Sequence, residues 1–84
     1  MPDLNTFLKS LISAPGLSGH EEPVRRLIQA EWRPLVDEIR TGGLGSLQAL
    51  RRGTGPEPRP SLLLSAHMDA IGMVVARIED GYLR

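Results

Sequence analysis

A histidine and an aspartate two residues apart, His67 and Asp69, are the side chains of this sequence whose types and spacing best suit metal chemistry. They follow an apolar run of three leucines at residues 62–64. In a β-strand, residues i and i+2 face the same side, and open α/β sheets bind ligands beyond the carboxyl ends of their strands. A metal-bound imidazole commonly donates its second ring N–H to a carboxylate. The pair therefore predicts that His67 binds a metal ion and that Asp69 orients the imidazole.

The same pair has a simpler interpretation. His-x-Asp arises often by chance, and a histidine at a strand end can be a structural residue that only hydrogen-bonds to its neighbour. The tripeptide by itself leaves both interpretations open.

The elements that must position this pair begin with a helix at the start of the chain. Asp3 is a preferred N-cap residue. From Leu4 to Ile12 the apolar residues recur at i, i+3, i+4, i+7 and i+8, the spacing of one helix face. Pro15 and Gly16 are expected to end this helix, and its apolar stripe is interpreted as core.

A second amphipathic helix is predicted next. Ser18 and Glu21 have the spacing of a capping box. Pro23 must lie in the first helical turn, because its nitrogen has no hydrogen to donate, so residue 19 or 20 is the alternative N-cap. The helix should end at residues 33–34, since the residue before a proline leaves the α region.

After the second helix the period of the pattern changes from 3.6 to 2. Residues 35–41 and 47–51 predict two strands of a hairpin around the glycine-rich turn at 42–45, which matches no phosphate-binding glycine motif. Residues 52–60 form a loop rich in proline and glycine within one domain. The apolar run at 62–65 then predicts a strand buried on both faces, as in a parallel or mixed sheet covered by helices.

The last segment predicts a further strand at residues 73–79, and Asp80-Gly81 is a strong signal for a type I′ hairpin turn. Only three residues follow, so the return strand is short. A catalytic zinc takes three protein ligands, whereas this sequence offers one convincing ligand. We therefore expect residues 1–84 to be an incomplete piece of a larger protein, with the hairpin near 71–84 leading toward a further segment.

Composition argues against several classes of protein. Ten basic and ten acidic residues cancel, and with one Trp, one Tyr and one Phe the chain lacks the basic stripe and stacking aromatics of a nucleic-acid binder. There is no cysteine for a disulfide or a thiolate ligand. Neither a secretory leader nor a membrane-length apolar stretch is recognisable. The expectation is a cytoplasmic protein that binds neither nucleic acid nor membrane, with a core that is marginal at this length.

Residues 66–72, Ala-His-Met-Asp-Ala-Ile-Gly, resemble the A-H-M-D-E-I-G segment of the tetrahedral and glutamyl aminopeptidases, dinuclear metallo-exopeptidases of which some carry endoglucanase labels. Residues 11–25 resemble that family's opening helix, loop and second helix. The resemblance covers nearly the whole chain. This sequence departs from the family at Ala70, where the family most often has Glu, and at residues 42–46, where the family has a D-x-x-G-N turn. Along a strand, residue 70 would point away from the face of the His-x-Asp pair.

This resemblance implies an α/β fold, the amino-terminal part of a zinc-exopeptidase-like α/β/α domain with two helices followed by a mixed sheet with hairpins. It implies metal-dependent removal of amino-terminal residues from peptides, with two divalent metal ions, zinc or cobalt, His67 as a ligand of one and Asp69 as its orienting residue. In the family the general base and the other ligands lie downstream, so the 84 residues alone are expected to be inactive. Family members assemble from dimers into dodecamers, which implies a homo-oligomer.

Two other classes stay open. A diverged, non-catalytic homologue could act as a structural or regulatory subunit, which Ala70 and the missing ligands favour. An unrelated α/β module could hold His67 and Asp69 as a pair that only hydrogen-bonds internally.

Overall fold

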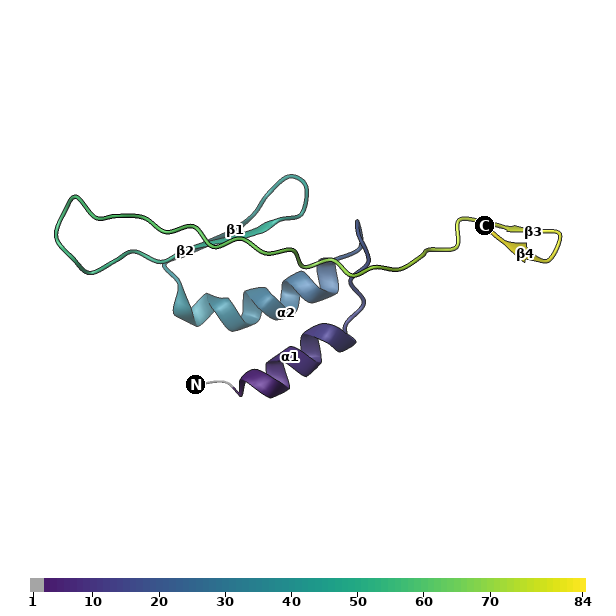
Figure 1. Cartoon of the computed structure of the whole chain (residues 1–84), viewed down its shortest axis with the longest axis horizontal. Helices are drawn as coiled ribbons and strands as arrows, with labels where there is room; N and C mark the ends of the chain where they lie inside the picture. Colours follow the sequence, from purple (N-terminus) through teal and green to yellow (C-terminus); the bar gives the residue numbers. More distant parts are fainter. Residues whose placement is uncertain (1–2) are drawn as a thin grey trace.

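The computed structural model describes residues 3–84 as a small α/β chain. Its elements are helices α1 (Leu4–Ser13) and α2 (Glu22–Trp32), the 3₁₀ turn η1 (Arg33–Leu35) and strands β1 (Glu38–Thr41), β2 (Leu47–Leu50), β3 (Ile78–Glu79) and β4 (Tyr82–Leu83). Figure 1 shows the helices and the β1–β2 hairpin at one end of an elongated molecule, with β3 and β4 at the other. The extents are 66 × 29 × 15 Å, and the radius of gyration is 17.4 Å, against about 12 Å for a compact domain of this length.

Helix α1 begins as the sequence predicted, at the N-cap residue Asp3. The Asn5 backbone N–H donates to Asp3 Oδ1 at 3.0 Å, and the Thr6 hydroxyl donates to Oδ2 at 2.8 Å. These bonds satisfy donors that the first helical turn leaves unpaired. They also stabilise the charged carboxylate, so the Thr6 hydroxyl first and the Asn5 N–H second hold the pKa of Asp3 below its ordinary value.

We predict that the start of α1 loosens in acid. Because the folded-state pKa of Asp3 is depressed, its contribution is present above the unfolded-state pKa and is lost as the pH falls through the lower folded-state value. The Asn5 amide resonance should therefore shift and lose exchange protection below about pH 4. The control is Asp3→Asn, which keeps a capping oxygen without the charge. An identical shift of Asn5 in this variant would contradict the prediction.

Helix α2 begins at Glu22, with Glu21 as N-cap and Pro23 in its first turn, as the missing proline N–H requires. The predicted capping box is wrong, and so is the alternative N-cap at residue 19 or 20, because Glu21 is the N-cap and its side chain makes no hydrogen bond to the helix. Instead the Glu21 carboxylate accepts from the Gly19 N–H at 2.8 Å. Gly19 has a φ of +83°, a left-handed turn that separates Ser18 from the helix start. The predicted end of the helix is confirmed at Trp32.

Both predicted hairpins are present. Strands β1 and β2 pair antiparallel from Glu38 opposite Leu50 to Thr41 opposite Leu47, around the predicted glycine-rich turn. Strands β3 and β4 pair around Asp80-Gly81, whose φ angles of +49° and +80° are those of a type I′ turn.

The predicted buried strand at residues 62–65 is wrong. This segment forms neither helix nor strand, and Leu62, Leu63 and Leu64 are 85%, 89% and 85% exposed. A strand needs a neighbouring backbone to satisfy its N–H and C=O groups, and nothing in the described part of the chain pairs with this one. An apolar run indicates that a segment suits burial, but it does not supply the partner.

The expected mixed sheet is likewise not formed by residues 3–84. They make two separate two-stranded antiparallel sheets, and parallel pairing is limited to one bridge, between Leu17 and Ala70. The strand predicted at 73–79 is reduced to Ile78–Glu79. Each observed sheet is a hairpin, for which the turn itself brings the partner strand into place.

The packed part of the molecule lies around α2. Val24 is the buried apolar side chain of the described residues, with 5% exposure, and Arg25 Nη1 donates to the Gly45 carbonyl at 3.2 Å, which ties α2 to the β1–β2 turn. The apolar stripe of α1 is not the core that the sequence predicted, because Leu4 and Ile12 are each 75% exposed. No helix within residues 3–84 is long and apolar enough to cross a bilayer.

Candidate metal site

His67 and Asp69 lie together, as the sequence predicted, but not on a strand. The residues around them carry no regular structure apart from the bridge at Ala70, so the two side chains meet in a segment that is not part of a paired strand. The distance from His67 Nδ1 to Asp69 Oδ1 is 3.0 Å, and the distance to the Asp69 carbonyl oxygen is 3.1 Å.

These two contacts define the tautomer of His67. Both partners of Nδ1 are acceptors, so Nδ1 carries a hydrogen, and in the neutral imidazole Nε2 then carries the lone pair. The side chain of His67 is 85% exposed and that of Asp69 is 43% exposed. An exposed imidazole whose second nitrogen is held by a carboxylate is the arrangement in which histidines commonly ligate metals.

The pair supplies one imidazole ligand and its orienting carboxylate. Within residues 3–84, no group of three His, Asp or Glu side chains comes together in a way that could hold a metal ion. A catalytic zinc site uses three protein ligands. The donor set therefore fits one ligand of a metal site and its orienting carboxylate, and the described residues bring no further donors to it.

The loop between α1 and α2 contacts the segment that carries this pair. The Ala70 N–H donates to the Gly16 carbonyl at 2.7 Å, and Leu17 and Ala70 form the parallel bridge. A side chain at Gly72 would collide with the side chain of Leu17. The sequence analysis missed this contact, because it interpreted Gly16 only as a helix stop. No periodicity or short motif signals this contact, because it joins residues that are far apart in the sequence.

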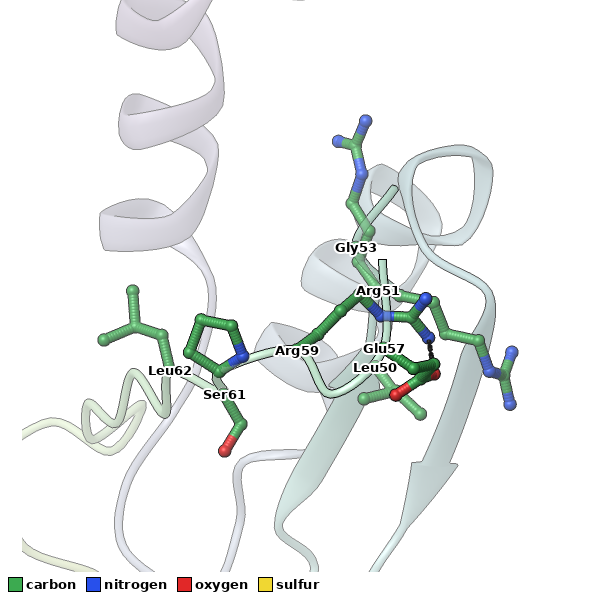
Figure 2. Close-up of a pocket in the computed structure, with 9 residues that line it drawn as sticks. Leu50, Arg51, Gly53, Glu57, Arg59, Ser61 and Leu62 are labelled. Carbon is green, nitrogen blue, oxygen red and sulfur yellow. Dashed lines mark ion pairs between the residues drawn. The ribbon is translucent and has the colours of Figure 1, made fainter. Parts of the chain in front are cut away.

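A cavity of about 430 Å³ lies away from the pair, at the start of the exposed loop after β2. It is lined by residues 50–53, 57 and 59–62. Figure 2 shows the Arg59 guanidinium paired with Glu57, at 2.7 Å, while Arg52 pairs with Glu38 at 3.3 Å. Neither His67 nor Asp69 lines this cavity, so it is separate from the candidate metal site.

Comparison with known proteins shows that the chain is similar to a class of proteins named aminopeptidases. The chain is 40% identical over 83 residues to a putative aminopeptidase of Acetivibrio thermocellus, covering 98% of this chain and 24% of the relative. It is 37% identical over 80 residues to the lysyl aminopeptidase of Pyrococcus furiosus, covering 93% and 22%. It is 32% identical over 78 residues to the glutamyl aminopeptidase of Lactococcus lactis, covering 92% and 22%.

The chain thus spans about a quarter of the length of the curated relatives that it matches. No protein-family model and no solved structure matches it.

Proposed function

We propose that this chain is the amino-terminal part of the catalytic domain of a metal-dependent aminopeptidase. The observation that carries the proposal is the similarity to proteins named aminopeptidases, which reaches 32–40% identity over 92–98% of the chain. The contact between His67 and Asp69 supports it, because a metal-dependent enzyme needs imidazole ligands that are oriented by a carboxylate.

In this proposal His67 ligates one metal of a dinuclear site through Nε2, and Asp69 holds the proton on Nδ1 and fixes the plane of the ring. A bound divalent metal polarises the peptide carbonyl and lowers the pKa of the attacking water. The further ligands and the general base come from outside residues 3–84. We also propose that strands from outside residues 3–84 pair with residues 62–65. That pairing would complete the sheet of an exopeptidase-like domain.

The test is hydrolysis of aminoacyl-anilides and short peptides by the full-length protein. We expect cleavage at the free amino terminus, loss of turnover after treatment with a chelator, and recovery when zinc, cobalt or manganese is added back. The matched control is the same substrate with an acetylated amino group, which should not be cleaved. A full-length protein that binds these metals but cleaves none of the substrates would be a non-catalytic homologue, and the proposal would be wrong.

A further inference from the structure

We propose that Gly16, Leu17 and Gly72 are positioning residues for the His67–Asp69 pair. This inference rests on the proposed function, since it concerns how the same metal site is held. The loop between α1 and α2 lies about 50 residues before the His67–Asp69 pair along the chain. It nevertheless contacts the segment that carries this pair.

The first support is a chain of hydrogen bonds through one peptide group. The peptide between Asp69 and Ala70 donates its N–H to the Gly16 carbonyl at 2.7 Å. Its C=O accepts from His67 Nδ1 at 3.1 Å. A peptide group is planar, with N–H and C=O on opposite sides, so fixing the N–H on Gly16 also fixes the direction of the acceptor that faces the imidazole. Hydrogen bonds linked in this way polarise and strengthen each other.

The second support is the exposure of the imidazole itself. The His67 side chain is 85% exposed, so packing against neighbours does little to hold it. Its hydrogen bonds within the described chain go to Asp69 alone, through the carboxylate and the carbonyl. The direction of the ring therefore depends on where the peptide after Asp69 is anchored, and that anchor is Gly16.

The third support is the absence of free space on both sides of the loop. A Cβ added at Gly16 would lie 2.7 Å from Val24 Cγ2, and Val24 is the buried side chain of α2. A Cβ added at Gly72 would overlap the Leu17 side chain. The loop is thus held between α2 and the site segment, and a single added methyl group at Gly72 must displace that segment or Leu17.

The experiment compares full-length variants by zinc affinity, measured by competition with a chromophoric chelator, and by the visible absorption spectrum of the cobalt-substituted protein. We expect Gly72→Ala to lower zinc affinity by about 10-fold or more, as loss of a residue that orients a ligand does, and to change the cobalt spectrum. The matched control is Gly55→Ala, because nothing lies within 4 Å of a Cβ at Gly55, and it should retain wild-type values.

A size exchange separates positioning from general damage to the fold. Leu17→Ala alone should also weaken zinc binding, whereas Leu17→Ala combined with Gly72→Ala should recover affinity and spectrum, because the new methyl group occupies the space that the leucine vacates. His67→Ala is measured beside them. If His67→Ala loses zinc while Gly72→Ala and Leu17→Ala keep wild-type affinity and spectrum, the positioning inference is overturned and the proposed function stands. If His67→Ala keeps wild-type zinc affinity, the proposed metal ligand itself is wrong.

Discussion

In the proposed full-length aminopeptidase, we expect His67→Ala to abolish activity at every metal concentration, and Asp69→Asn to lose activity that excess metal partly restores. This difference follows because the two side chains have different roles in the proposed site. Alanine at 67 removes the ligating nitrogen. Asparagine at 69 keeps an oxygen beside Nδ1 but removes the charge that orients the ring, and changes of that kind commonly cost about 10- to 100-fold in metal affinity or activity.

The measurement is the rate of aminoacyl-anilide hydrolysis as a function of added zinc, cobalt or manganese, together with the metal content of each purified variant. Gly55→Ala again serves as a substitution in open space. Wild-type rate and metal content in His67→Ala would mean that the site lies elsewhere and that His67 and Asp69 are a structural pair. Equal behaviour of the two variants at all metal concentrations would contradict the separate roles.

The second large effect concerns residues 1–84 produced by themselves. We expect no turnover of peptides or anilides and only weak zinc binding, since the described residues bring no three donors together and a catalytic zinc takes three protein ligands. The exposed leucines at 62–64 should also favour self-association.

Calorimetric titration with zinc checks this expectation, with His67→Ala of the same 84 residues as the control for binding at other surface groups. Tight binding of one zinc per chain that His67→Ala removes would show that these residues build a complete site. Hydrolysis of an aminoacyl-anilide by the 84 residues would contradict the prediction more directly.

Local features of the structure could be predicted from the sequence. Asp3 caps α1, Pro23 lies in the first turn of α2, and Asp80-Gly81 turns the last hairpin, because each depends on residues a few positions apart. Burial could not be predicted in this way. Leu62 to Leu64 are apolar enough for an interior strand, but a strand forms only beside another backbone, and the sequence of the segment does not contain that information.

In the candidate site, too, the local contact could be predicted from the sequence and the long-range contact could not. The two-residue spacing of His67 and Asp69 predicted that they meet, although the strand on which that prediction rested is not formed. The contact of Ala70 with Gly16 joins two distant parts of the chain. No periodicity or short motif encodes such a contact, so it became visible only in the structure.

The distance in sequence between Gly16 and Ala70 also bears on the order of folding. Helices and hairpins form from neighbouring residues in microseconds or less, so α1, α2 and the β1–β2 hairpin can form before the chain closes on itself. The bond from Ala70 to Gly16 closes a loop of about 50 residues, and each doubling of loop length adds about 0.6 kcal/mol to the entropy cost of closure. The segment bearing His67 is anchored by this long-range contact, so we expect metal affinity to appear during refolding no earlier than the closure of this loop.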